Sequence, residues 1–242
     1  MRTIIVVLFV FIFLVVSLPI QGILWIIGKF ARDWADMVSL RIVQWAFRMV
    51  YILSGVKLNI IGQENVPTDE PVLYIGNHRS IFDTVITYSL CPGKTGYISK
   101  KTMGKVPGLN IWMKRLYCLF LDRDDIKQGL KVILTAIDQV KNGISMCVFP
   151  EGTRCKESDS TAMLPFKEGT FKIATKTGCK IVPMALTHTD DVLENHLPWI
   201  RRTRVTLEYG KPIDPKELSK DELKHVGGYC HEVIQNMLRK NA

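Results

Sequence analysis

The N-terminus is the most apolar part of the chain. Residues 3–28 contain no charged side chain, and residues 4–16 are an unbroken run of Ile, Val, Leu and Phe. As a helix, residues 3–28 would span about 39 Å at about 1.5 Å per residue, which exceeds a hydrocarbon core of about 30 Å. Pro19, Gln21 and Gly22 interrupt the run. A tilted span, a kinked span and a shallow insertion are therefore all open.

A cleaved secretory signal peptide is the alternative interpretation, because Arg2 precedes the apolar run. No Ala-x-Ala-like cleavage site follows, however, and apolar residues resume at 23–27. We therefore expect the segment to be retained.

Residues 34–53 mix aromatic and apolar side chains with charges that recur at helical spacing. This pattern is typical of a helix at the boundary between water and lipid, and a helix packed on the following domain is the alternative. We predict that residues 1–56 form a membrane-attaching helical module and that residues 57–242 form a separate domain.

Short apolar runs alternate with helical patterns in the rest of the chain. The runs that suit strands are residues 56–60, 72–75, 118–121, 146–149, 181–185 and 205–209. Helical patterns cover residues 81–90, 126–140, 166–176 and 215–239, the last interrupted at Gly227-Gly228. Strands that alternate with helices predict an α/β fold with a largely parallel central sheet flanked by helices.

The formal net charge of +9 suggests an acidic or anionic partner. No zinc-finger spacing, RNP-like aromatic motif or basic helix array is present, so we do not expect nucleic-acid binding. An anionic lipid surface, a phosphate-bearing substrate or an acidic carrier protein fits the charge better. The six cysteines show no metal-ligand spacing, and we interpret them as reduced thiols.

A histidine and a carboxylate, His78 and Asp83, follow the apolar run 72–75. In one continuous helix, positions i and i+5 lie about 140° apart and their side chains diverge. The two meet only if His78 lies in the turn that leaves the strand and Asp83 lies in the next helix. Asp83 would then bind one imidazole nitrogen and leave the other free to take a proton. A solvated turn histidine is the alternative.

The neighbours of this histidine have simpler interpretations. Asn77 either shapes the turn or has a direct role, and Arg79 and Ser80 are expected to be a solvated turn residue and a helix cap. Ser80 as a nucleophile is an alternative, but no nucleophile-elbow glycines surround it. The other four histidines lack carboxylates at matching positions and are expected to be structural or exposed: His188, His196, His225 and His231.

A second polar cluster, residues 149–154, follows the apolar run 146–149. Gly152 allows close approach of the backbone to a ligand, and Thr153 and Arg154 supply hydrogen bonds to a phosphate. The charge of Glu151 would repel a phosphate, so bracing an arginine or holding the loop is its alternative role. A tight turn with exposed charges is the alternative for the whole cluster. The polar loop 155–164 that follows is where a mobile active-site loop is expected.

Four blocks of the sequence, in order, resemble those of the glycerolipid acyltransferases, in particular the bacterial 1-acylglycerol-3-phosphate acyltransferases. The blocks are Asn77-His78-x4-Asp83, a run that ends in Phe120-Leu121-Asp122-Arg123, residues 149–154, and Val182-Pro183-Met184. The resemblance covers roughly residues 57–210. The chain departs from the family pattern at Tyr117, where a glycine is usual, at Cys155, where a serine is frequent, and at Lys101-Thr102-Met103-Gly104, which replaces a lysine-x-glutamate-leucine segment.

The resemblance implies transfer of a fatty acyl group from a thioester of acyl carrier protein or coenzyme A to lysophosphatidate, with no cofactor or metal. It makes His78 the base and Asp83 the residue that orients it. The implied substrate contacts are Lys101, Arg123, Glu151, Gly152, Thr153 and Arg154. The expected location is the cell membrane, with the catalytic domain on the cytoplasmic side, because basic residues after the apolar run outnumber Arg2 before it. Glycerol 3-phosphate or another lysolipid as acceptor, a lipid hydrolase, and a non-catalytic phospholipid-binding protein remain as alternatives.

Overall fold

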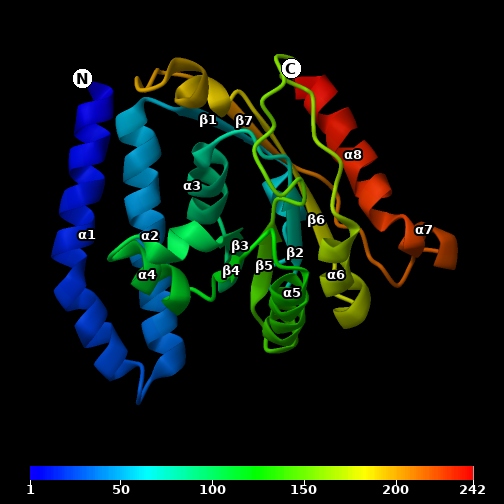
Figure 1. Cartoon of the computed structure of the whole chain (residues 1–242), viewed down its shortest axis with the longest axis horizontal. Coiled ribbons are helices and arrows are strands. Elements are labelled where there is room, and N and C mark those ends of the chain that lie inside the picture. Colours follow the sequence, from blue (N-terminus) through cyan, green and yellow to red (C-terminus); the bar gives the residue numbers. More distant parts are fainter. Residues whose placement is uncertain (242) are drawn as a thin grey trace.

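The central feature of the fold is a seven-stranded sheet covered by helices on both faces, seen in a computed structural model that describes residues 1–241 (Figure 1). The strand order is β1-β7-β6-β2-β5-β3-β4, and only the β6–β7 pair is antiparallel. The strands are β1 Lys57–Ile61, β2 Leu73–Gly76, β3 Thr95–Lys100, β4 Leu119–Leu121, β5 Ser145–Val148, β6 Ile181–Thr187 and β7 Arg204–Tyr209. The predicted α/β fold with a largely parallel sheet is confirmed.

The helices follow most of the predicted patterns. They are α1 Arg2–Ile27, α2 Arg32–Ser54, α3 Ile81–Ser89, α4 Leu109–Arg115, α5 Ile126–Lys141, α6 Lys172–Thr177, α7 Lys220–Lys224 and α8 Val226–Asn241. Strand β3 and helix α4 were not predicted. Helix α6 is shorter than the pattern at 166–176, because the 3-10 turn Glu168–Phe171 precedes it.

The predicted interruption at Gly227-Gly228 is wrong, because α8 runs through both glycines and the break lies at His225. The N–H group of Gly227 donates to Glu168 Oε2 at 3.3 Å, and a Cβ atom there would lie 2.4 Å from Glu168 Oε1. A close tertiary contact thus explains this glycine, and it outweighs the low helix propensity of the pair.

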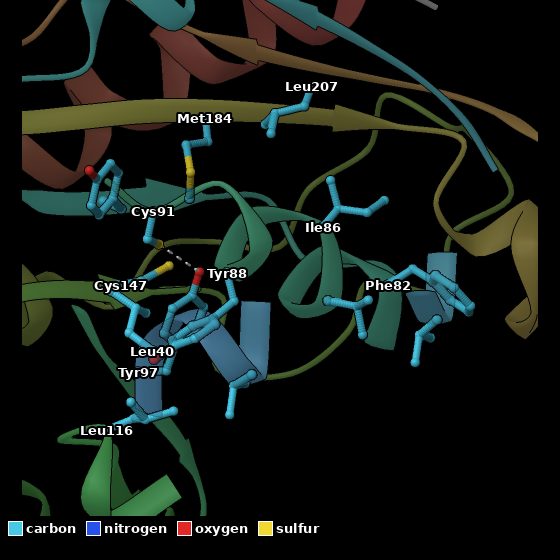
Figure 2. Close-up of a cluster of buried hydrophobic side chains, with 14 of the residues drawn as sticks. Leu40, Phe82, Ile86, Tyr88, Cys91, Tyr97, Leu116, Cys147, Met184 and Leu207 are labelled. Atoms are coloured by element: carbon cyan, nitrogen blue, oxygen red, sulfur yellow. Dashed lines mark hydrogen bonds between the residues drawn. The ribbon is translucent and has the colours of Figure 1, made fainter. Parts of the chain in front are cut away.

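Alternating side chains of the strands supply two separate cores. Tyr74 of β2 packs with α2 and α3, and its neighbours Leu73 and Ile75 pack with α5, α6 and α8 on the other face. Figure 2 shows part of the first core, where Leu40 of α2 and Ile86 of α3 are fully or almost fully buried. This two-residue alternation is what a sheet buried on both faces requires.

Helix α1 is the one helix among residues 1–241 that is long and apolar enough to cross a membrane, judged by length and composition. Pro19 lies within the helix and does not end it. Most of its large apolar side chains are exposed, including Ile4 and Phe11. This helix weakly suggests membrane association.

Helix α2 packs on α3 and the sheet through one face. Gln44 Nε2 donates to the Cys91 carbonyl at 2.7 Å and to the Tyr88 carbonyl at 3.3 Å, just after and within α3. The alternative interpretation, a helix packed on the domain, therefore holds for this face. Trp34 and Trp45 on α2 are exposed, and their contact with lipid stays a prediction. The domain division after residue 56 also stays a prediction. Helix α2 shares a hydrophobic core with the sheet across that boundary.

Candidate active site

The turn between β2 and α3 is organised around the buried carboxylate of Asp83. Its Oδ2 atom accepts hydrogen bonds from the backbone N–H groups of Arg79 at 2.7 Å and Ser80 at 2.8 Å. The same oxygen lies 2.8 Å from His78 Nδ1. The Ser80 hydroxyl accepts from the N–H of Phe82 and completes a capping box at the start of α3. His78 thus lies in the turn and Asp83 in the helix, as predicted.

The His78 imidazole is held on one face as well as at Nδ1. It stacks on the Phe149 ring with 4.5 Å between centroids and 13° between planes. Its side chain is 18% exposed, and its Nε2 atom has no hydrogen-bond partner among residues 1–241. The ring therefore has a fixed orientation, with Nε2 as the nitrogen left to exchange a proton.

Glu151 links the turn after β2 to the turn after β5. Its buried carboxylate accepts from the N–H of His78 at 2.6 Å through Oε1 and from the N–H of Leu164 at 2.7 Å through Oε2. Both oxygens are already engaged by backbone, so the structure favours its role as a loop brace over the substrate contact predicted for it. Burial, with a smaller contribution from the charge of Asp83, raises the pKa of Glu151 to about 7, against the effect of the two amide bonds.

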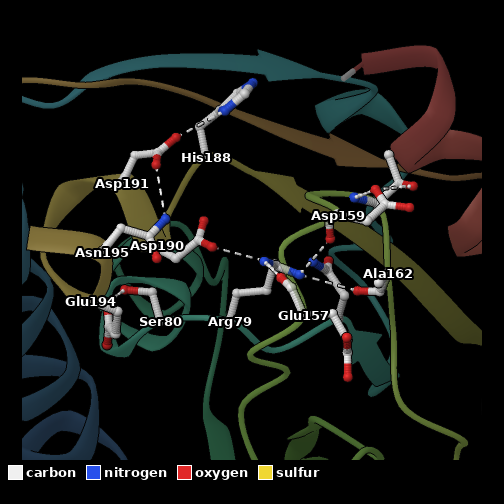
Figure 3. A network of polar contacts seen from close by, with 12 residues as sticks. Arg79, Ser80, Glu157, Asp159, Ala162, His188, Asp190, Asp191, Glu194 and Asn195 are labelled. Carbon is white, nitrogen blue, oxygen red and sulfur yellow. Dashed lines mark hydrogen bonds and ion pairs between the residues drawn. The ribbon is translucent and has the colours of Figure 1, made fainter.

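Arg79 was expected to be a solvated turn residue, and this expectation is wrong. Its side chain is only 5% exposed, and its Nε atom donates to Asp190 at 2.9 Å (Figure 3). The rest of the guanidinium donates to the carbonyls of Glu157, Asp159 and Ala162. The polar loop after the second cluster has no helix or strand, and the hydrogen bonds from this buried arginine hold its backbone in place.

The end of the second polar cluster projects from the surface. Gly152 has a φ of 73°, and the side chain of Lys167 lies against its Cα. The N–H of Gly152 donates to the Phe149 carbonyl at 3.0 Å, so it is not available to a ligand. Thr153 and Arg154 are exposed. Lys167 is not among the substrate contacts predicted above, because only the fold brings it to this turn.

Lys101 and Arg123 follow β3 and β4, whose carboxyl ends lie on the same sheet edge as those of β2 and β5. Lys101 Nζ pairs with Asp122 at 2.9 Å, which holds the pKa of this half-buried carboxyl below its usual range. Arg123 is exposed and has no ion-pair partner within residues 1–241. In parallel sheets this edge is where ligands bind. The substrate roles of both residues remain predictions.

Two further polar residues have partners that the sequence alone does not reveal. Asn77 has a structural role, because its amide donates to the Leu186 carbonyl at 2.9 Å and accepts from the Leu186 N–H at 2.8 Å. It ties the end of β2 to β6. His188 was expected to lack a carboxylate, but its Nδ1 atom lies 3.1 Å from Asp191 Oδ2. Both members of this second pair are about 40% exposed, unlike His78 and Asp83.

A cavity of about 920 Å³ lies elsewhere, between α1, α2, α4 and α5. Its lining is basic, and the cations are Lys29, Arg32, Lys114, Arg115 and Lys131. It includes neither His78 nor Arg154. Among residues 1–241, no group of three His, Cys, Asp or Glu side chains is placed to hold a metal ion.

Residues 57–187, more than half of the chain, match the family model described as Acyltransferase. The chain belongs to the acyltransferase family. Together with the contact between His78 and the buried Asp83, this membership makes the edge of the sheet after β2 and β5 the candidate active site of an acyltransferase.

Relatives of this acyltransferase carry more specific names. It is 28% identical over 193 residues to the 1-acyl-sn-glycerol-3-phosphate acyltransferase of Saccharomyces cerevisiae, covering 79% of this chain and 62% of the relative. It is 28% identical over 203 residues to the enzyme of that name from Haemophilus influenzae, covering 81% and 80%. The chain thus spans less than two thirds of the yeast protein's length.

The fold of this acyltransferase is also found in a solved structure. The 1-acyl-sn-glycerophosphate (LPA) acyltransferase of Thermotoga maritima superposes with a TM-score of 0.78 at 24% identity. The match covers 99% of this chain and 97% of that one. At this identity the likeness shows the fold alone, including the arrangement of the N-terminal helices with the sheet.

The raised pKa of Glu151 has a measurable consequence for stability. Its pKa lies near 7 in the folded chain and at 4.5 in an ordinary carboxyl, so ionisation opposes folding above pH 7 and this cost disappears as the pH falls toward 4.5. Relative to Glu151→Gln, which does not titrate, the wild type should gain on the order of 1–3 kcal/mol between pH 8 and pH 5. The measurement is the difference in melting temperature across this range in detergent. A difference that is flat with pH would contradict the assignment.

Proposed function

We propose that this acyltransferase moves a fatty acyl group from a thioester to the free hydroxyl of lysophosphatidate and so forms phosphatidate. The observation that carries the proposal is the 2.8 Å contact of His78 Nδ1 with the buried Asp83, which leaves Nε2 free at the sheet edge. The names of the relatives support lysophosphatidate as the acceptor.

In the proposed mechanism, His78 Nε2 takes the proton of the acceptor hydroxyl as its oxygen attacks the thioester carbonyl. The C–O bond forms, the C–S bond breaks, and the imidazolium returns the proton to the departing thiolate. Asp83 keeps the proton of the neutral ring on Nδ1 and stabilises the imidazolium, whose charge the Phe149 ring also favours. The acceptor is itself the nucleophile, so no acyl-enzyme is required.

The acceptor phosphate is assigned to the turn after β5. Arg154 offers a guanidinium fork to phosphate oxygens, and Lys167 adds a second cation beside Gly152. The N–H of Gly152 already donates to the Phe149 carbonyl. The further donors assigned to the phosphate are therefore the backbone N–H groups of Thr153 and Arg154. Arg123 and Lys101, along the same edge, are assigned to phosphate-bearing parts of the acceptor or donor. Either an acyl carrier protein or coenzyme A fits as donor.

We also propose that α1 and the exposed side of α2 hold the enzyme on the cell membrane, with the catalytic domain in the cytoplasm. The acceptor and the product are both bilayer lipids. The cations after the apolar run outnumber the single Arg2 before it, and they are Lys29, Arg32, Arg41 and Arg48. If α1 spans, this bias favours the C-terminal side inside, and a shallow insertion gives the same placement.

The first prediction for this function concerns the base. His78→Ala should lower turnover of lysophosphatidate by about a hundred- to ten-thousand-fold, and Asp83→Asn should also be severely impaired because the tautomer is no longer fixed. The assay follows phosphatidate by mass spectrometry, with acyl carrier protein and coenzyme A thioesters as donors.

His188→Ala serves as the control for the base, because it removes the exposed histidine of the second His–Asp pair, and it should retain most of the turnover. Ser80→Ala tests the alternative nucleophile. It should lower turnover far less than His78→Ala, although it removes the cap of α3 and a donor to Glu194. Wild-type rates in purified His78→Ala would exclude the mechanism, and release of free fatty acid without an acceptor would identify a hydrolase instead.

The second prediction concerns the acceptor phosphate. Arg154→Ala should raise the KM for lysophosphatidate about ten- to a hundredfold, the loss expected for one charge-assisted hydrogen bond of about 1.5–3 kcal/mol. The KM for the acyl donor should change much less, and Arg154→Lys should recover only part, because an ammonium cannot reproduce the fork. Residual activity toward monoacylglycerol, which lacks the phosphate, is the control. Equal losses on both acceptors would assign Arg154 to loop support instead.

The third prediction concerns topology. Lys224 is exposed on α7, so a cysteine placed there by Lys224→Cys should react with a membrane-impermeant maleimide only after the cells are permeabilised. The wild type gives the background, since five of its six free cysteines are buried. Labelling in intact cells would place the catalytic domain outside.

A further inference from the structure

The carboxylate of Glu194 lies between Arg154 and the start of α3. Its Oε1 atom accepts from Arg154 Nη1 at 2.6 Å and from the N–H of Ile81 at 2.9 Å. Its Oε2 atom accepts from the Ser80 hydroxyl, and Figure 3 shows the two side chains together. The Glu194 side chain is only 16% exposed, whereas that of Arg154 is 47% exposed. An internal anion is therefore bound by the arginine that is assigned to the substrate phosphate.

The donors around Glu194 are of the kind that bind phosphate. A guanidinium, a hydroxyl and a backbone N–H that has no partner within its own helix converge on one anionic group. While Arg154 Nη1 donates to Glu194, the guanidinium cannot use both of its terminal nitrogens for a bidentate contact with a phosphate. A phosphate placed beside the carboxylate would also meet a like charge. Arg154 can bind the acceptor fully only after it releases Glu194.

The segment that carries Glu194 is fixed at its base and exposed beyond it. Asp190 is held by the buried Arg79, and Val192 is fully buried. After Glu194 the chain runs along the surface, where Leu197 is 67% and Trp199 is 57% exposed. Glu194 can therefore leave Arg154 without breaking the contact between Arg79 and Asp190 that holds the base of the segment.

We propose that Glu194 occupies the acceptor-phosphate site of the empty enzyme and that the acceptor phosphate displaces it from Arg154. This inference rests on the proposed function. A phosphate monoester carries nearly two charges and three strong acceptor oxygens, so it can replace a carboxylate with one charge and two oxygens. A neutral acceptor cannot, and it gains nothing from Arg154. Glu194 is thus a residue that determines specificity for phosphate-bearing acceptors.

Glu194→Gln is the sharpest test, because the amide oxygen can still accept from Ile81 and Arg154 while the charge is removed. The KM for lysophosphatidate should fall about three- to tenfold, somewhat less than the loss of a full charge-assisted hydrogen bond, with kcat little changed. Inorganic phosphate should become a stronger competitive inhibitor by a similar factor. The KM for monoacylglycerol should not change. Glu217→Gln, which removes an exposed charge far along the chain, controls for net charge and should leave all these values unchanged.

A double variant shows whether Glu194 acts through Arg154. In an Arg154→Ala background, Glu194→Gln should lower the KM by a clearly smaller factor than in the wild type, since only the repulsion between like charges is left to relieve. A rise in KM for Glu194→Gln alone would mean that Glu194 supports Arg154, and it would overturn the proposal. A fall in KM of the same size without Arg154 would overturn it too.

Failure of the proposed function is distinguishable from failure of this inference. If the wild type transfers no acyl group to lysophosphatidate, the proposed function fails, whatever Glu194 does. Calorimetric titration with inorganic phosphate then tests the inference without turnover. Binding that is tighter in Glu194→Gln than in the wild type supports displacement, and equal or weaker binding overturns it.

Discussion

The rest of the site depends on the satisfaction of one buried charge, the carboxylate of Asp83. A fully buried carboxylate is costly unless hydrogen bonds and opposite charge compensate it. Here a single oxygen receives two backbone N–H groups of the turn and the His78 imidazole, at the positive end of α3. The other oxygen, Oδ1, has no partner among residues 1–241. The hydrogen bonds that compensate the charge of Asp83 therefore also set the path of the turn and the orientation of the candidate base.

Two more buried ionisable side chains fix the backbone next to this turn. Glu151 accepts from the backbone N–H groups of His78 and Leu164. Arg79 donates to three carbonyls of the polar loop between residues 154 and 164. Both use backbone groups as partners, so the loop is positioned without a helix or strand of its own. The same Arg79 fixes Asp190 at the base of the segment that bears Glu194. The turn after β2 thus contacts both the loop after β5 and the segment that bears Glu194.

The sequence reveals the local part of this design better than the distant part. His78 and Asp83 are five residues apart, so helix geometry decides where each must lie if the two side chains are to meet. The apolar runs predict six of the seven strands, but β3 is missed because Thr95, Tyr97 and Lys100 give no clear alternation. Arg79 and Glu194 could not be placed, since their partners are backbone groups or residues tens of positions away, which carry no sequence signal. Lys101 shows the same limit, because spacing does not tell which carboxylate it meets.

Helix α3 connects the chemistry to the N-terminal helices. Its first turn carries Asp83, while its last residues are bound by α2 through Gln44 and through Arg48, which donates to the Ser89 carbonyl at 3.3 Å. Helix α2 in turn packs along α1 (Figure 1). With α1 at the membrane, as proposed, the height of His78 above the lipid is set by rigid packing instead of by a flexible linker. A base that must meet a hydroxyl only a few atoms from the acyl chain of a membrane lipid requires such a fixed height, which gives a physical reason for α2 to share its core with the sheet.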